Sequence, residues 1–198
     1  MRAGVIDIGS NSIKLLIGEK SDQGMTVLES LKNIVPIGKS TFFDGQIAQE
    51  DINQIIGILE KYKKVLKEYD VTNVKVIATT AVREADNKEI FLDTLRRKTD
   101  LLIEVLSVGD VIYYIDAYIS HKLKDSYPLH TKNLIIAEIG AGSLDISVMR
   151  KGFTVMNLGL PLGTLRLKKM MAKLDGSHEE TLEALKEHIQ TDILYFKK

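Results

Sequence analysis

Apolar and polar positions alternate in two separate stretches of the chain, and each stretch predicts three β-strands in succession. The first set covers Ala3 to Ile8, Ser12 to Glu19 and Met25 to Ile34; the second covers Asn133 to Glu138, Leu144 to Arg150 and Phe153 to Leu158. Short apolar runs separated by turn-forming residues are typical of strands joined by tight turns. The chain therefore contains two similar β-β-β openings.

A helical period replaces the alternation after the first opening. Apolar residues recur at helical spacing from about Gln49 to Tyr69, after a loop predicted from Gly38 to Gly45 whose Phe42 and Phe43 should cap the core. Further predicted elements are a strand at Asn73 to Ala78, a turn into helix at Thr79 to Ala85, a helix at Lys88 to Arg97, a strand at Leu102 to Leu106 and a helix at Val111 to Lys122. The predicted order to this point is β-β-β-α-β-α-β-α.

The second opening leads into two more predicted helices and no further strand. One helix covers about Gly163 to Lys173, and Ser177 with Glu180 forms a capping-box pattern that begins the other. The last helix has one apolar face, formed by Leu182, Leu185, Ile189, Ile193 and Phe196. We expect residues 1–125 to form a first domain and residues 126–198 the start of a second, incomplete one, and we expect the apolar face to associate with another copy or with missing sequence.

Composition narrows the classes of function. Lysine plus arginine and aspartate plus glutamate both number 27, so the net charge is zero, which disfavours non-specific nucleic-acid binding. The chain has no cysteine, and its four histidines lack zinc-ligand spacing. Neither a membrane-length apolar run nor a signal peptide is visible, so we expect a cytoplasmic protein without membrane contact.

Each opening contains the same short pattern between its first two strands. Asp7-Ile8-Gly9-Ser10-Asn11-Ser12 is the first glycine turn, and Glu138-Ile139-Gly140-Ala141-Gly142-Ser143 is the second. Successive backbone amides in a glycine turn form an anion-binding concavity, and the Ser and Asn side chains add donors. The acid at the strand end suits Mg²⁺ or its waters, which bridge to phosphate oxygens. The pattern predicts a phosphate and metal site, whereas the structural alternative is a pair of hairpin turns left by a duplication.

Arg83 is the third candidate, because it follows Thr79-Thr80 in the first turn of a predicted helix. Helix N-termini attract anions, and the guanidinium fork matches phosphate geometry. An ion pair with Glu84 or Glu89 on a solvent-exposed helix is the structural alternative.

These segments together resemble the exopolyphosphatase and guanosine pentaphosphate phosphohydrolase (Ppx/GppA) family. The resemblance rests on the first glycine turn, on Ala78-Thr79-Thr80-Ala81-Val82-Arg83-Glu84-Ala85-Asp86-Asn87, on the second glycine turn and on Leu160-Pro161-Leu162-Gly163-Thr164-Leu165-Arg166-Leu167. It spans nearly the whole chain in the family's order and spacing.

The resemblance implies an α/β, actin-like (ribonuclease-H-like) fold of two βββαβα-type halves with the site in the cleft. It also implies Mg²⁺-dependent release of terminal phosphate from inorganic polyphosphate or pppGpp. The phosphate-binding residues would be Gly9, Ser10, Asn11, Ser12, Arg83, Gly140, Ala141, Gly142 and Ser143, and the metal-side acids would be Asp7 and Glu138.

The chain departs from the family pattern at four positions. The family usually has Ser-Gly-x-Glu-Glu-Ala before the boundary, where the second glutamate orients the attacking water, and this chain has Ser107-Val108-Gly109-Asp110-Val111-Ile112. Val111 can neither accept a proton nor position water, so Asp110 and Glu138 are the remaining catalytic candidates. The other departures are Glu138 for aspartate, Ala141 for glycine and Pro36 for a basic residue.

Two further functions stay open at this point. One is a weak or inactive member that binds polyphosphate or guanosine penta- or tetraphosphate and regulates a partner or an attached domain. The other is a kinase-like relative with the actin-like fold, which would need an adenosine pocket from sequence that this chain lacks.

Overall fold

The structure is a computed structural model that describes residues 1–22 and 24–195. The chain divides into two compact units, Met1–Ser107 and Val108–Lys198. Within the described ranges, none of the helices is both long and apolar enough to cross a bilayer.

The first unit is built on a twisted sheet whose strands match the predicted alternation. Its strands are β1 (Arg2–Ile8), β2 (Ser12–Ser21), β3 (Gly24–Ile34), β4 (Asn73–Ala78) and β5 (Ile103–Val105). The order across the sheet is β3-β2-β1-β4-β5, with β1, β2 and β3 antiparallel in sequence and β4 and β5 parallel to β1. This arrangement brings the carboxyl ends of β1, β4 and β5 to the same edge.

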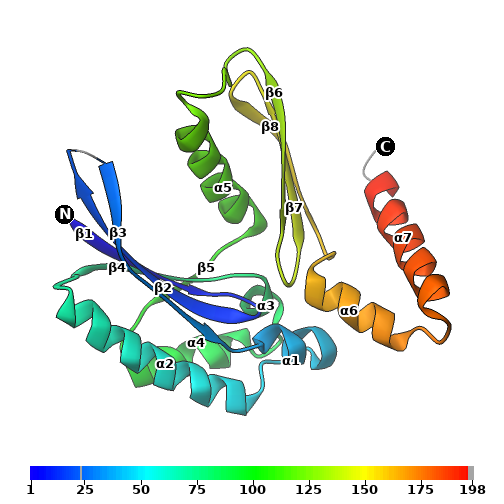
Figure 1. Cartoon of the computed structure of the whole chain (residues 1–198). Coiled ribbons are helices and arrows are strands. Elements are labelled where there is room, and N and C mark those ends of the chain that lie inside the picture. The colour runs from blue at the N-terminus through cyan, green and yellow to red at the C-terminus, as the bar shows by residue number, and fades with distance from the viewer. Residues whose placement is uncertain (23, 196–198) are drawn as a thin grey trace. The chain divides into compact units, whose positions relative to one another are not determined.

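Helices of the first unit bury one face of that sheet. They are α1 (Ile37–Asp44), α2 (Gln49–Glu68), α3 (Thr80–Glu84) and α4 (Lys88–Thr99). Figure 1 shows α2 running along the sheet. Ile6 and Ile8 of β1 and Leu15 of β2 are fully buried in one core with Leu59 of α2, because the period of two places alternate strand residues on the same side.

The segment predicted as a loop from Gly38 to Gly45 is instead helix α1. Its N-terminus has no side-chain cap, so the sequence lacks the capping residue that would predict a helix here. Ile37 and Thr41 of this helix are buried. Phe42 packs against the core as expected, whereas Phe43 is exposed and does not. Tertiary packing therefore forms this helix.

The second unit repeats the antiparallel three-strand opening. Its elements are α5 (Val108–Leu123), β6 (Asn133–Ile139), β7 (Leu144–Arg150), β8 (Phe153–Leu160), α6 (Thr164–Lys173) and α7 (His178–Tyr195). Among the described residues the strands form a sheet in the order β6-β7-β8. Helix α5, which the predicted boundary after residue 125 assigned to the first domain, packs on β7 and β8 (Figure 1).

The capping box that begins α7 is confirmed. The Glu180 amide donates to Ser177 Oγ at 3.3 Å, and the Ser177 amide donates to Glu180 Oε2 at 2.8 Å. Phe196, the last member of the predicted apolar face, lies outside the described residues.

Candidate functional site

The first glycine turn closes on itself and leaves two amides without a backbone acceptor. The Gly9 amide donates to the Ser12 carbonyl at 3.0 Å. In the described part of the chain, no backbone carbonyl accepts from the amides of Ser10 or Asn11. Ser10 and Ser12 are buried and Asn11 is exposed, so the backbone and Asn11 are the more accessible donors. The turn can bind an anion through amides, as the sequence predicts.

Asp7, at the end of β1, lies directly opposite Lys14 of β2. The two are register partners, and Lys14 Nζ is 3.5 Å from Asp7 Oδ2. Burial raises the pKa of the Asp7 carboxyl above its ordinary value, and the Lys14 ammonium counteracts part of that rise. Asp7 Oδ1 is buried, and no hydrogen-bond partner for it is found among the described residues. An oxygen in this state gains from a cation, which suits a metal-side acid.

Arg83 lies in α3, just beyond the carboxyl end of β4. Its guanidinium donates to the Leu106 carbonyl at 2.9 Å and to Thr80 Oγ1 at 3.3 Å. The Thr79 amide donates to the Ile8 carbonyl at 3.2 Å, which ties the start of α3 to the end of β1. In the described residues, the acceptors of the Arg83 guanidinium are a carbonyl and a hydroxyl. These contacts do not show the ion pair with Glu84 or Glu89 that was the structural alternative. Arg83 is half-buried and held at the sheet edge where the first glycine turn begins.

The second glycine turn reproduces the closure of the first. The Gly140 amide donates to the Ser143 carbonyl at 2.8 Å, and in the described residues no backbone carbonyl accepts from the amides of Ala141 or Gly142. The substitution of alanine for glycine at position 141 therefore leaves the turn intact.

Helix α6 is hydrogen-bonded to the carbonyl groups of this second turn. The Thr164 and Leu165 amides donate to the carbonyls of Gly140 and Ala141 at 3.0 and 2.9 Å. Arg166 Nε donates to the Gly142 carbonyl at 2.7 Å. These bonds use the free amides of the helix N-terminus and hold the carbonyls of the turn on the side of α6.

The acid of the second turn has a carboxylate neighbour that the sequence reasoning missed. Glu138 of β6 and Asp145 of β7 are register partners, as Asp7 and Lys14 are in the first unit. Asp145 is buried and accepts a hydrogen bond from Ser143 Oγ at 2.9 Å, whereas Glu138 is exposed. The sequence did contain a signal for this neighbour. Residues at equal distances before and after a hairpin turn lie opposite each other, so a turn that ends at Ser143 places Asp145 opposite Glu138.

The residues fit Mg²⁺ only as a sparse set of ligands. In the parts of the chain that the structure describes, no group of three or more His, Asp or Glu side chains could hold a metal ion. Mg²⁺ commonly takes one or two carboxylates and completes its shell with water and substrate phosphate. Each turn offers such a carboxylate: a Cβ on Gly9 would lie 3.9 Å from both Asp7 oxygens, and one on Gly140 would lie 3.8 and 3.9 Å from those of Glu138. Each glycine therefore lies directly beside the carboxylate of its own turn.

Asp110 lies in the first turn of α5 and is exposed. Val111, its neighbour, is half-buried. Asp110 therefore stays a predicted catalytic residue, and the Val111 side chain has no group that could replace a carboxylate.

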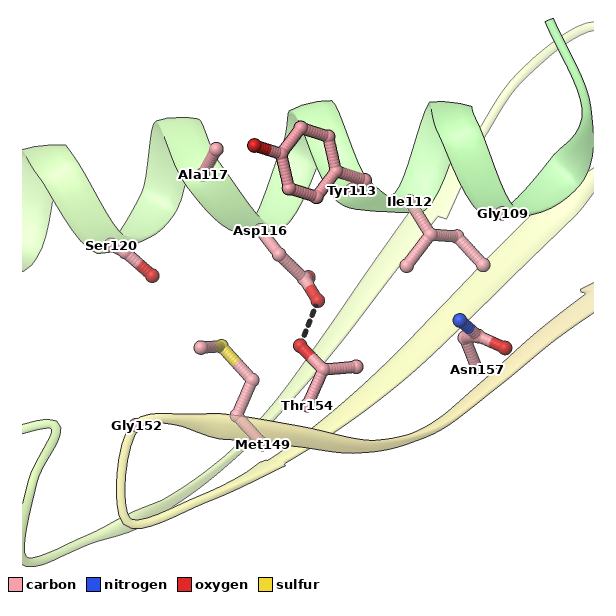
Figure 2. Close-up of a pocket in the computed structure, with 10 residues that line it drawn as sticks. All are labelled: Gly109, Ile112, Tyr113, Asp116, Ala117, Ser120, Met149, Gly152, Thr154 and Asn157. Atoms are coloured by element: carbon pink, nitrogen blue, oxygen red, sulfur yellow. Dashed lines mark hydrogen bonds between the residues drawn. The ribbon is translucent and has the colours of Figure 1, made fainter.

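Figure 2 shows a separate hollow of about 250 Å³ between α5 and the β7–β8 hairpin. Asp116, which lines it, accepts hydrogen bonds from Ser147 Oγ at 2.7 Å and from Thr154 Oγ1 at 2.5 Å. Both carboxylate oxygens of this buried residue are therefore engaged by the protein itself. The hollow contains none of the predicted site residues, and its polar groups join α5 to the sheet.

Comparison with known proteins places these features in a family. The chain matches the Ppx/GppA phosphatase family over residues 5–197. Exopolyphosphatase 1 of Mycobacterium tuberculosis is 27% identical over 171 residues, which cover 85% of this chain and 48% of the relative. The chain thus spans about half the length of that curated relative.

Two solved structures show the same architecture. The Ppx/GppA family member of Aquifex aeolicus is 27% identical with a TM-score of 0.79, covering 100% of this chain and 63% of that one. An exopolyphosphatase from Cytophaga hutchinsonii has a TM-score of 0.84 at 23% identity, covering 99% and 62%. The structural matches confirm the predicted actin-like ATPase fold.

Proposed function

Because the chain belongs to the Ppx/GppA phosphatase family, we propose that it acts in the hydrolysis of terminal phosphoanhydride bonds. The proposed substrate is inorganic polyphosphate, with pppGpp as the second candidate, since relatives such as the one from M. tuberculosis are named exopolyphosphatases. The observation that carries the proposal is the repeated turn, closed by the same Gly-to-Ser hydrogen bond in both units.

Each turn is proposed to bind phosphate oxygens through its two amides that donate to no backbone carbonyl in the described part of the chain. These amides belong to Ser10 and Asn11 in one turn and to Ala141 and Gly142 in the other. Arg83 adds a positive charge whose position is set by the Leu106 carbonyl and Thr80. Phosphoryl transfer depends mainly on positioning and charge stabilisation, which preset amides and a held guanidinium can supply.

The acids would hold Mg²⁺ and the attacking water. Asp7 is the proposed metal-side acid of the first turn, and Glu138 is that of the second, with its register partner Asp145 beside it. When bound, Mg²⁺ would neutralise phosphate charge. Asp110 would accept a hydrogen bond from the attacking water, since Val111 cannot.

The test is phosphate release from polyphosphate and from pppGpp with and without Mg²⁺, using the parent chain, Arg83→Ala and Val111→Glu. We expect Mg²⁺-dependent release, loss of most of it in Arg83→Ala, and faster release in Val111→Glu, which restores a second carboxylate beside Asp110. Binding is measured in parallel by thermal stabilisation, which reports ligand affinity without turnover.

One outcome would reject the proposal, and another would remove only Arg83 from the proposed site. The phosphohydrolase assignment would be rejected if neither the parent nor Val111→Glu hydrolysed either substrate and polyphosphate did not stabilise the protein. Unchanged hydrolysis in Arg83→Ala would remove Arg83 from the site while leaving the activity in place. The matched control is Arg97→Ala, which changes an exposed arginine of α4 that pairs with Asp93 and should leave release unchanged.

A further inference from the structure

Helix α1 is in direct contact with the first glycine turn at its N-terminal end. The Gly38 amide donates to the Ser10 carbonyl at 2.7 Å. A Cβ on Gly38 would lie 2.9 Å from that carbonyl oxygen, so only glycine permits this approach. Helix α1 is therefore attached to the turn at the Ser10 carbonyl.

The other end of α1 is fastened to the segment that follows Arg83. Gly45 has a positive φ of 79°, and its carbonyl accepts from the Asp86 amide at 2.8 Å. Asn87 then pairs with both backbone groups of Ile47: its Nδ2 donates to the Ile47 carbonyl and its Oδ1 accepts from the Ile47 amide, each at 2.9 Å. Three hydrogen bonds thus join the end of α1 to the end of α3.

Asn87 makes these contacts in place of the helix-capping hydrogen bond that is usual at its position. It is the N-cap residue of α4, where an asparagine side chain normally accepts from an amide of the first helical turn. Here its side chain makes no capping hydrogen bond. The amide is used instead for a contact with Ile47, a residue far away in sequence and only 2% exposed.

We propose that Asn87 is a positioning residue, which acts through α1 to hold Arg83 at a set distance from the first glycine turn. The contacts of Arg83 with the Leu106 carbonyl and Thr80 orient its guanidinium. The Asn87 contacts join the segment after α3 to the segment after α1, the helix that contacts the turn through Gly38. The inference rests on the proposed function, because Arg83 and the turn must bind the same ligand for their spacing to matter.

The test compares Asn87→Ala, Asn87→Asp and the parent. Asn87→Ala removes both hydrogen bonds to Ile47. Asn87→Asp keeps the oxygen that accepts from the Ile47 amide but places a second oxygen against the Ile47 carbonyl, so it breaks the other bond. Affinity for a short polyphosphate is measured by calorimetry on the whole chain. We expect about tenfold weaker binding in Asn87→Ala, which corresponds to a coupling of ordinary size between residues of one hydrogen-bond network.

Thr99→Val is the matched control. Thr99 is buried at the end of α4, and its hydroxyl donates to the Leu95 carbonyl at 2.8 Å. The substitution also removes a buried side-chain hydrogen bond from the first unit but does not touch α1 or α3. Polyphosphate affinity should stay at the parent value in Thr99→Val, even where the unfolding midpoint falls as far as in Asn87→Ala.

A double-mutant cycle separates positioning from general loosening. In the Arg83→Ala background, Asn87→Ala should weaken binding no further, because residues that act through one another are not additive. An equal loss in both backgrounds, or no loss in the parent background, would overturn the inference.

Hydrogen exchange separates failure of this inference from failure of the proposed function. Absence of polyphosphate binding by the parent would refute the proposed function. Hydrogen exchange would then still test whether Asn87 acts on the first glycine turn through α1. If α1 transmits the effect, Asn87→Ala speeds exchange at the Gly38 amide as well as at Ile47 and Asp86. Faster exchange at Ile47 and Asp86 with an unchanged Gly38 amide would overturn the inference.

Discussion

Gly163 packs directly against the backbone of the second glycine turn, and replacing it by alanine should displace that turn. Gly163 has φ −71° and ψ 156°, a backbone conformation open to any residue. A Cβ there would lie 2.3 Å from the Gly142 carbonyl carbon and 2.4 Å from both the Ala141 oxygen and the Gly142 nitrogen. The requirement for glycine is therefore steric, and all three obstructing atoms belong to backbone.

The magnitude follows from the movement that this contact demands. Ordinary carbon contacts need a further separation of roughly 1 Å, and backbone cannot turn aside as a flexible side chain can. Overpacking costs about 1–3 kcal/mol. Moving the turn also strains the bonds from the Thr164 and Leu165 amides, each worth about 0.5–1.5 kcal/mol. We expect Gly163→Ala to lower the free energy of unfolding of the second unit by about 2–6 kcal/mol.

Gly57 provides the matched control, because it is exposed within α2 and has open space around its Cβ position. Gly57→Ala should raise the free energy of unfolding by about 0.5–1 kcal/mol through helix propensity. Both variants are measured by urea denaturation followed by circular dichroism, with hydrogen exchange to assign the loss to the second unit. A Gly163→Ala variant within about 1 kcal/mol of the parent would refute the steric reasoning.

Three further predictions concern charge and capping. Asp7→Asn should stabilise the metal-free protein near neutral pH: the raised pKa of Asp7 means that native stability falls as pH rises from the ordinary value of 3.8 through the raised one. The same variant should lose stabilisation by Mg²⁺ in thermal melts, and persistence of that effect would exclude Asp7 from the metal site. Ser177→Ala should cost about 1 kcal/mol in urea denaturation, and no change would show that the capping box does not stabilise α7. Asp116→Ala should cost about 3 kcal/mol, because Ser147 loses a charged acceptor; a stability like that of the parent would contradict this.

Much of the fold could be read from the sequence because its signals are local. Period-two alternation predicted the strands of both openings, and β4 and β7 have the predicted bounds. The Ser177–Glu180 pattern predicted the cap of α7, since a capping box is formed within a single turn. The duplicated acid-Gly-Ser pattern likewise identified two turns that close in the same way.

The tertiary structure decided what depends on pairing between distant segments. Helix α1 was predicted as a loop, because its stability comes from packing and from contacts at its two ends with Ser10 and Asp86. The neighbours of the two acids, Lys14 and Asp145, emerge only once strand register is known. The sequence by itself therefore determined the family and the two turns, whose interactions span a few residues. The structure alone determined what surrounds and fastens them, because those hydrogen bonds and steric contacts join residues brought together by folding.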